Sequence, residues 1–411
     1  MKILLIHHNA SNLGDVAIAE ATINQLRKQF DNCEILLESS NPQLSKKYFK
    51  GIVILPRLFD INGINHTNKI FSFEFVIKNI PFLIRTSFAY AISLIFIIFR
   101  KNICLFPILI EYKNADLILS IAGDSISQDY AYFLRFYEIW LLRQLKKIVI
   151  LYAQSIGPFT KNNLKYAKKY LSMVTAIFAR DKTTYKLMKQ YGINTKIFIT
   201  ADTVISLSPR ISSTTKSVIN KYSLNKNVIC MVIRTLKYTN YSLKEYGLYL
   251  NGMKIIVDKL ERNGFKLLFI ASIPEDALAA VAFSKSYHLN NPILKLYDYM
   301  PSEVKTILSK VKLLISPRMH PIILAASMDV PAIGIGREFK MKNFMQMIGL
   351  KELFIDMAPF SSKKALLKLN KLLVNYKGYK KTLKHNIVNM QYLSYQNVLY
   401  ADKIYHSYRN N

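Results

Sequence analysis

Short runs of apolar residues alternate along the chain with amphipathic stretches of helical length. The first run is Ile3–Ile6 in the predicted strand Lys2–Ile6, and the polar turn His7–Asp15 separates it from an amphipathic stretch over Val16–Phe30. A short continuous apolar run is typical of a strand that is buried on both faces, and its alternation with helices is typical of parallel sheets built from βαβ units. The pattern therefore predicts an α/β fold.

The same alternation recurs on both sides of a polar stretch near the middle of the chain. In the first half we expect further strands at Glu34–Glu38, Ile52–Leu55, Leu117–Ala122, Ile148–Ala153 and Ala176–Ala179, and helices at Asn163–Val174 and Asp181–Tyr191. In the second half we expect strands at Val228–Ile233, Lys266–Ala271, Leu313–Ser316 and Val330–Ile335, and helices at Leu243–Asn263, Pro301–Lys310, Pro321–Met328 and Lys340–Ile348.

The polar stretch Ser206–Ser217 contains proline and is rich in Ser and Thr, which suits a linker between domains. At 411 residues the chain also exceeds the usual size of a single core. We therefore expect an N-terminal domain over 1–210, a C-terminal domain over 218–375 and a basic, Tyr-rich helical tail over 376–411. Two Rossmann-like domains of this kind place the functional site in a central cleft, at the carboxyl ends of their strands.

An insertion at about 70–110 is more apolar than the rest of the first half. Its centre, Phe88–Phe99, is a continuous apolar run that extends back to Ile80 with Arg85 as the one charged residue. A bilayer crossing needs roughly 20 apolar residues, and shorter runs are typical of interfacial or core helices. Arg100 and Lys101 follow the run and are placed to meet anionic headgroups. An interfacial helix is favoured, and a core helix and a true span stay open.

Basic residues strongly outnumber acidic ones, with 57 Lys and Arg against 26 Asp and Glu and a net charge of +31. This charge suits an anionic membrane face or phosphorylated substrates, although codon bias can also enrich lysine. The sequence contains no recognised nucleic-acid-binding module, so we expect no nucleic-acid partner. The scattered cysteines and the missing signal-peptide core predict a cytoplasmic protein, peripheral at the inner face of the membrane.

Polar residues stand where several strands of the first half are expected to end. Asn12, Gly14 and Asp15 lie in the first turn, where glycine admits a close backbone approach and a helix N-terminus offers N–H groups to a ligand. For this turn taken alone, a helix-capping role of Asp15 is favoured over ligand binding. Turn residues at the ends of the later strands include Asp124, Gln154 and Arg180. Their shared placement on one rim of one sheet predicts a substrate-binding surface.

In the second half, Arg234 follows the strand Val228–Ile233, and Arg318 and His320 follow the strand Leu313–Ser316. Two arginines at one sheet edge suit bidentate recognition of phosphate or carboxylate. A lone histidine is usually structural, but His320 stands two positions after Arg318 at a predicted helix start. We therefore expect an anion site. The sequence shows no cluster with metal-ligand spacing, so we expect no metal.

As a set, these motifs resemble the polysaccharide pyruvyl transferase family. The resemblance rests on N-x-G-D at Asn12–Asp15, Q-S-I-G-P-F at Gln154–Phe159, A-R-D at Ala179–Asp181 and R-M-H at Arg318–His320. It implies a glycosyltransferase-B-like pair of domains that moves pyruvate from phosphoenolpyruvate onto a sugar as a ketal. The sugar belongs to a cell-surface polysaccharide or its lipid-linked precursor, and the family requires no cofactor beyond phosphoenolpyruvate as co-substrate.

The resemblance also implies roles for residues. Arg234 and Arg318 would bind the donor, and His320, whose side-chain type has an ordinary pKa of about 6.5, would be the catalytic acid. Residues Asn12, Gly14 and Asp15 match the N-terminal motif of the family. From their placement at strand ends we infer that acceptor-binding or supporting roles belong to Asn12, Gly14, Asp15, Asp124, Gln154 and Arg180. The base is unassigned between Asp15 and Asp124.

Two other functions fit the same sequence. A glycosyltransferase of this architecture would use a nucleotide sugar, but the paired glutamates typical of nucleotide-ribose binding are not evident after Pro331, where Glu338 stands alone. A membrane-docking scaffold without catalysis would explain the apolar insertion. It would leave Arg234, Arg318 and His320 unexplained.

Overall fold

The computed structural model describes residues 1–59, 80–99, 106–124, 126–127, 132–236, 241–336 and 339–409. These residues form two compact units. Unit 1 comprises Met1–Ser11, Ala21–Thr203 and Leu393–Asn411, and unit 2 comprises Asn12–Glu20 and Val204–Tyr392. Within the described part of the chain, none of the helices has the length and apolar character that crossing a membrane requires.

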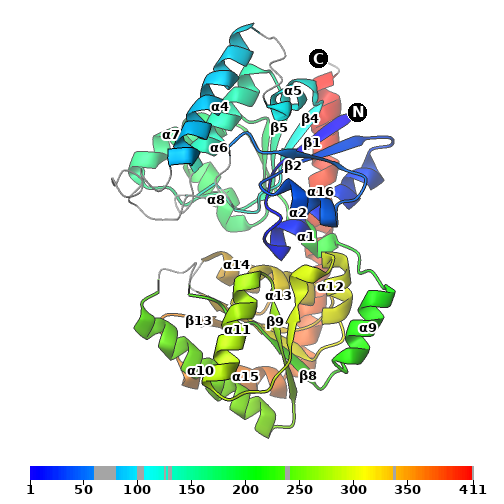
Figure 1. The fold of residues 1–411 in the computed structure, drawn as a ribbon, viewed down its shortest axis with the longest axis vertical. Helices are drawn as coiled ribbons and strands as arrows, with labels where there is room; N and C mark the ends of the chain where they lie inside the picture. The colour runs from blue at the N-terminus through cyan, green and yellow to red at the C-terminus, as the bar shows by residue number, and fades with distance from the viewer. Residues whose placement is uncertain are drawn as a thin grey trace. The chain divides into compact units, whose positions relative to one another are not determined.

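Unit 1 contains a seven-stranded parallel sheet in the order β3-β2-β1-β4-β5-β6-β7 (Figure 1). Its central strands are buried along most or all of their length because helices cover both faces of such a sheet. The strands are β1 (Lys2–His8), β2 (Glu34–Ser39), β3 (Val53–Pro56), β4 (Leu117–Ser120), β5 (Val149–Gln154), β6 (Ala176–Ala179) and β7 (Lys196–Ile199). The helices of unit 1 are α2 (Pro42–Tyr48), α4 (Ile80–Phe99), α5 (Pro107–Asn114), α6 (Tyr132–Gln144), α7 (Lys161–Leu171) and α8 (Lys182–Gln190).

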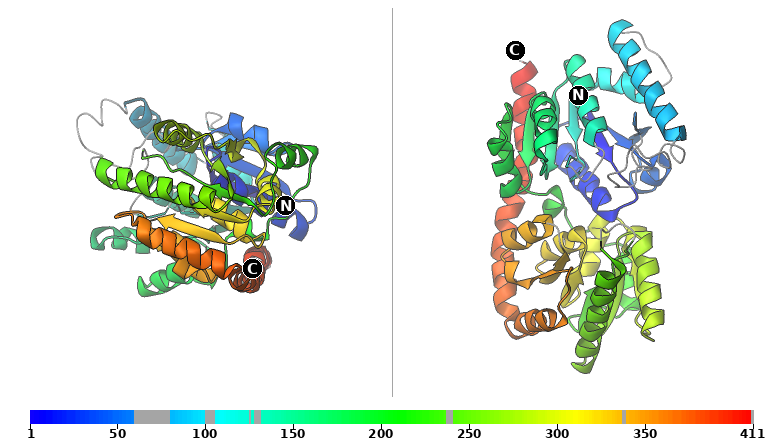
Figure 2. Two further views of the ribbon diagram at one scale, coloured as in Figure 1. Left: turned by 90° about the horizontal axis from the view of Figure 1, so that it is seen from below. Right: turned by 90° about the vertical axis from the view of Figure 1, so that its left-hand side faces the viewer.

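Unit 2 contains a six-stranded parallel sheet in the order β10-β9-β8-β11-β12-β13, with helices on both faces (Figure 2). The strands are β8 (Val228–Met231), β9 (Lys266–Ala271), β10 (Ile293–Lys295), β11 (Leu313–Ser316), β12 (Ala332–Gly336) and β13 (Phe354–Asp356). The helices are α9 (Ser213–Lys221), α10 (Leu243–Arg262), α11 (Pro274–Ser286), α12 (Pro301–Leu308), α13 (Met319–Ala326), α14 (Phe339–Met347) and α15 (Ser362–Val374).

Two helices contribute residues to both units. Helix α1 (Leu13–Gln29) has its first two turns in unit 2 and the rest in unit 1. The long helix α16 (Tyr376–Arg409) belongs to unit 2 as far as Tyr392 and to unit 1 from Leu393. In unit 1 its end is fixed by buried polar contacts, since Asn397 donates to the carbonyl of Ala201 at 2.9 Å.

The predicted alternation of strands and helices is confirmed, with three strands at the predicted bounds: β6, β9 and β11. The linker prediction over Ser206–Ser217 is wrong in its second half. Residues from Ser213 onward form α9, because Ser212 and Thr215 make a capping box at its start. Among the described residues, the pattern also left six α-helices and three strands unpredicted, namely α2, α5, α6, α9, α11, α15, β7, β10 and β13.

The apolar run of the insertion forms α4, a helix of 20 residues. One face of α4 packs on the core of unit 1 through Ala89, Ile92 and Phe96. The opposite face is exposed and apolar. The flanking residues 60–79 and 100–105, which include Arg100 and Lys101, lie outside the described residues.

Candidate active site

The loop from β11 to α13 carries Arg318 and His320. Ser316 ends the strand, and its hydroxyl accepts from the amide of Arg318 at 2.9 Å and donates to the Arg318 carbonyl at 2.9 Å. Helix α13 begins at Met319, two residues before the predicted start at Pro321. Proline is tolerated there because the first four amides of a helix have no partner within it. His320 therefore lies in the first turn of α13.

The guanidinium group of Arg318 is fixed by Asp276. Nε and Nη2 of Arg318 each donate to one carboxylate oxygen of Asp276, both at 2.8 Å. Asp276 is fully buried in the first turn of α11, which follows β9. Its Oδ1 atom also accepts from the amide of Thr235 at 3.4 Å, just after β8. One carboxylate thus joins the ends of three neighbouring strands: β9, β8 and β11.

Asp276 was not among the predicted site residues. The sequence does hold a signal for Asp276. It stands shortly after the predicted strand Lys266–Ala271, as Arg234 and Arg318 stand shortly after their own strands. The pairing changes how Arg318 can bind an anion. Asp276 engages Nε and one N–H of Nη2, so a ligand can use the end of the guanidinium group, through Nη1 and the second N–H of Nη2.

Gly14 packs against the ring of His320. The ring of His320 occupies the space that a side chain at position 14 would need, because a Cβ there would lie 2.0 Å from Nδ1 and 2.4 Å from Cγ of the imidazole. Both residues belong to unit 2. The first turn of α1 therefore contributes to the surroundings of His320. This turn is also bonded to the loop after β9, since the amide of Leu13 donates to the carbonyl of Ser272 at 3.4 Å.

The N-terminus of α1 does not offer free amides to a ligand, which corrects the sequence-based expectation. Asn12 caps the helix: its Oδ1 accepts from Gly14 at 3.0 Å, and its carbonyl accepts from Asp15 and Val16 at 3.1 Å. Leu13 is bonded to Ser272. The cap is thus Asn12, whereas the sequence suggested Asp15 as the capping residue. Asp15 follows in the first turn and is half-buried.

Arg234 follows β8, with its backbone held by two tyrosines of α10. The buried hydroxyl of Tyr249 accepts from the Arg234 amide at 3.2 Å, and the hydroxyl of Tyr246 donates to the Arg234 carbonyl at 2.9 Å. Burial raises the pKa of Tyr246, so this hydroxyl keeps its proton. The structure thus gathers Gly14, Arg234, Arg318 and His320 in unit 2.

The predicted acceptor-side residues Gln154 and Arg180 are buried in unit 1. Gln154 donates through Nε2 to the carbonyl and hydroxyl of Ser120, both at 2.6 Å. Arg180 pairs with Asp202 at 2.7 Å and donates to the hydroxyl of Ser155 at 2.8 Å. Both residues can therefore support an acceptor site only through their neighbours. Asp124 is half-buried just beyond β4.

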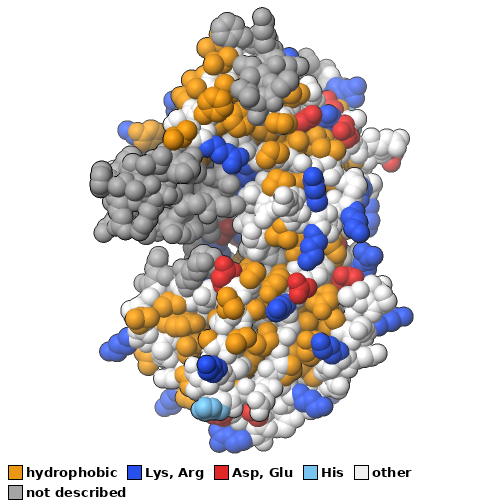
Figure 3. All heavy atoms as spheres, viewed as in Figure 1, with side chains coloured by type: hydrophobic (Ala, Val, Ile, Leu, Met, Phe, Trp, Pro, Cys, Tyr) orange, Lys and Arg blue, Asp and Glu red, His pale blue; other side chains and the backbone are white. Residues whose placement is uncertain are grey.

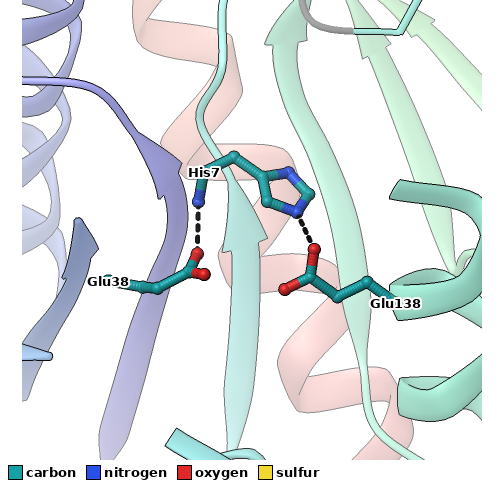
Figure 4. Close-up of side chains that lie close together, drawn as sticks. All are labelled: His7, Glu38 and Glu138. Atoms are coloured by element: carbon teal, nitrogen blue, oxygen red, sulfur yellow. Dashed lines mark hydrogen bonds and ion pairs between the residues drawn. The ribbon is translucent and has the colours of Figure 1, made fainter. Parts of the chain in front are cut away.

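A buried network that the sequence did not predict lies beside Gln154. Nδ1 of His7 contacts the hydroxyl of Ser120 at 2.8 Å. Figure 4 shows its other two contacts: Nε2 lies 2.6 Å from the carboxylate of Glu138, and the amide donates to Glu38 at 2.6 Å. Burial and the nearby Arg135 cation lower the pKa of His7 to about 4. The imidazole is thus neutral at neutral pH, donating to Glu138 and accepting from Ser120.

The same network holds a strained backbone. His7 has a φ of 74°, a left-handed conformation that costs a non-glycine residue about 1–3 kcal/mol. The contacts of its ring and amide hold it at the end of β1, where the register with β2 shifts between Leu5 and His8. No simple periodicity signals such a group, because its members come from β1, β2, β4 and α6.

Ligand atoms of His7, Glu38 and Glu138 lie within 4.8 Å of one another, and such side chains can bind a divalent metal. Their surroundings argue for a hydrogen-bonded network instead. His7 and Glu138 are hydrogen-bonded directly, and the buried Arg135 pairs with Glu138 at 3.2 Å. The expectation that the protein needs no metal stays a prediction.

The sequence profile of the polysaccharide pyruvyl transferase family matches residues 12–338. The chain belongs to this family. The matched segment includes all of the candidate site residues, from Asn12 to His320. This polysaccharide pyruvyl transferase family member is therefore a transferase, as the sequence motifs implied.

Solved structures similar to this polysaccharide pyruvyl transferase family member share its fold at low sequence identity. The UDP-GlcNAc 2-epimerase of Neisseria meningitidis has a TM-score of 0.57 and 12% identity, with 97% of this chain and 100% of the epimerase covered. A glycosyltransferase from Rickettsia africae has a TM-score of 0.56 and 14% identity, with 98% of each chain covered. The UDP-GlcNAc 2-epimerase of Methanocaldococcus jannaschii has a TM-score of 0.58 and 12% identity, covering 90% of this chain and 92% of that one. The predicted glycosyltransferase-B-like fold class is confirmed.

Proposed function

We propose that this protein transfers the pyruvyl group of phosphoenolpyruvate onto two hydroxyls of one sugar, in a cell-surface polysaccharide or its lipid-linked precursor. The product is a cyclic pyruvate ketal, and phosphate is released. The observation that carries the proposal is the family match over 12–338, because this segment contains the arginines and the histidine that the reaction calls for.

The chemistry defines what the site must supply. A proton adds to C3 of phosphoenolpyruvate, and the resulting cationic C2 accepts the first sugar hydroxyl. The C2–O bond to phosphate then breaks, and the second hydroxyl of the same sugar closes the ketal at C2. The two sugar hydroxyls lose two protons. One of them restores the acid that protonated C3, and the other leaves with phosphate. The reaction thus needs one acid, one base and cationic groups for the phosphate and carboxylate.

His320 is our candidate for the acid. Its ring lies in the first turn of α13 and is positioned by the close packing of Gly14. Arg318 and Arg234 are the candidate anion-binding residues, with Asp276 orienting Arg318. Because Gly14 lies against His320, we assign Asn12, Gly14 and Asp15 to the donor side rather than to the acceptor side.

Asp124 is the candidate residue of unit 1 for contact with the acceptor, since Gln154 and Arg180 are buried. The network of His7, Ser120 and Gln154 supports the ends of β1, β4 and β5 beneath it. In this assignment the donor chemistry is carried by Arg234, Arg318 and His320 of unit 2.

A nucleotide-sugar transferase is the second candidate, because similar folds occur in proteins solved with UDP-GlcNAc bound. Glu338, the one carboxylate that could bear on nucleotide binding in the sequence, lies outside the described residues. A thermal-shift titration of the purified protein separates the two functions. We expect phosphoenolpyruvate to raise the melting temperature, and UDP-GlcNAc and GDP-mannose to leave it unchanged. Stabilisation by a nucleotide sugar and none by phosphoenolpyruvate would overturn the proposal.

A further inference from the structure

Helix α4 is fixed to unit 1 along one face. Ala89, Ile92 and Phe96 are buried in the core, and the hydroxyl groups of Ser93 and Tyr137 are 2.5 Å apart, which joins α4 to α6. The ring of Tyr137 also packs against Tyr90, with centroids 4.6 Å apart. These contacts set which face of α4 points away from the core.

The outer face of α4 carries a continuous apolar stripe. Ile84, Phe88, Ile95 and Ile98 are 64%, 49%, 38% and 70% exposed. With the exposed Ala91 between them, they follow the alternating spacing of four and three residues that keeps side chains on one side of a helix. In Figure 3 apolar side chains gather at the top of the view, where Figure 1 places α4. Large exposed apolar side chains in one stripe are typical of an interaction surface.

The sequence that contains this stripe carries charge of a single sign. Between Lys78 and Lys101 the sequence contains the four basic residues Lys78, Arg85, Arg100 and Lys101 and no acidic residue. Arg85 is exposed, next to Ile84. Parallel pairing of two α4 helices from two copies of the chain would bring the two Arg85 side chains together, and α4 has no carboxylate to offset them. An anionic surface is the partner that satisfies both the apolar stripe and the cations.

We propose that α4 docks flat on an anionic lipid bilayer, with its outer stripe in the boundary between headgroups and acyl chains. Phe88, which belongs to the stripe, is an aromatic side chain of the kind that favours this boundary, and the exposed Arg85 would lie at the level of the headgroups. The docking does not depend on the pyruvyl chemistry. It would bring the enzyme to the surface at which lipid-linked glycans are found.

Flotation with lipid vesicles tests this surface. The full chain is mixed with small vesicles of phosphatidylcholine, either alone or with 30 mol% phosphatidylglycerol. The experiment is done at physiological salt, where the Debye length is about 8 Å. We expect the wild-type protein to float with the anionic vesicles and not with the neutral ones. Replacing Ile95→Glu and Ile98→Glu together should lower binding to the anionic vesicles at least tenfold.

The matched control is Leu278→Glu with Val281→Glu on α11. These residues are also exposed, at 69% and 55%, and also three positions apart on a helix, so the change in charge and hydrophobicity is the same. We expect this variant to bind like the wild type, and both variants to melt like it. Equal binding by the two double variants, or no flotation of the wild-type protein, would overturn the proposal. So would a concentration-dependent dimer that the α4 variant abolishes without any vesicle binding.

Discussion

Gly14 and His320 are in van der Waals contact, although they stand more than three hundred positions apart in the sequence. The Cα of Gly14 lies so close to the imidazole that a Cβ would fall 2.0 Å from Nδ1 of His320. Gly14 is the second residue of α1, and it shares a compact unit with His320. The glycine of the N-x-G-D motif is thus explained by packing against the histidine of the R-M-H motif.

The contact predicts an unusual sign for the substitution Gly14→Ala. In a helix, alanine is favoured over glycine by about 1 kcal/mol, so the change should stabilise unless the ring of His320 is in the way. We expect the clash to dominate and the free energy of unfolding to fall by about 1–3 kcal/mol. Chemical denaturation measures this change.

Two variants control for the helix and for the ring. Gly247→Ala on α10 has no atom within 4 Å of its Cβ and should be neutral or stabilising. In a His320→Ala background, Gly14→Ala should lose its cost because the methyl group fills the space of the ring. A destabilisation that persists in that background would show that Gly14 acts through something other than His320.

Arg318 and Asp276 form the second testable pair. Arg318→Lys keeps the charge but loses the two parallel hydrogen bonds, and it leaves the buried carboxylate of Asp276 with at most one contact from position 318. We expect the free energy of unfolding to fall by about 1–3 kcal/mol, less than for a fully buried pair because Arg318 retains some exposure. The exposed Arg262→Lys is the matched control and should change little. Similar stability of the two lysine variants would contradict this account of Asp276.

The sequence could predict the alternation of elements because buried parallel strands are continuous apolar runs. Strands β6, β9 and β11 therefore have the predicted bounds. The short edge strands β10 and β13 have three residues each, too few for a pattern. Helix α11 was missed because apolar residues occur around its whole circumference, including the exposed Leu278 and Val281.

Site residues could be predicted from their place at strand ends, but their partners could not. Arg318 stands at the end of a strand, which the local pattern reveals. Asp276 pairs with it from α11, and Gly14 reaches His320 from α1, and both contacts depend on the tertiary fold. The same dependence on the tertiary fold explains why Gln154 and Arg180, which were expected at a ligand surface, are buried. The sequence places them at strand ends, and burial then depends on neighbours such as Ser120 and Asp202.

Glu38 makes the stability of unit 1 depend on pH. Burial, with the nearby Glu138 carboxylate, raises the pKa of Glu38 from 4.5 to about 7. The folded state therefore holds this proton more tightly than the unfolded state. The resulting stabilisation is fully present below pH 4.5 and is lost as the pH rises to about 7. The variant Glu38→Gln, which resembles the protonated form, should escape this loss.

We expect Glu38→Gln to gain about 1–3 kcal/mol relative to the wild type between pH 5 and pH 8, since one pKa unit corresponds to about 1.4 kcal/mol. Urea denaturation of both proteins at the two pH values measures the difference. Glu34→Gln, at the exposed start of the same strand, should show no such trend. A difference between wild type and Glu38→Gln that is the same at both pH values would mean that Glu38 is ionised in the folded protein.

His320→Ala tests the proposed acid directly. We expect the rate of phosphate release from phosphoenolpyruvate, with methyl glycosides bearing a free 1,3-diol or vicinal diol as acceptors, to fall by about 10²–10⁴-fold. The thermal shift by phosphoenolpyruvate should persist, because Arg234 and Arg318 are unchanged. His385→Ala, an exposed histidine of α16, is the matched control and should keep wild-type activity. Activity of His320→Ala within about threefold of the wild type would remove His320 from the chemistry, and loss of the thermal shift alone would make it a binding residue.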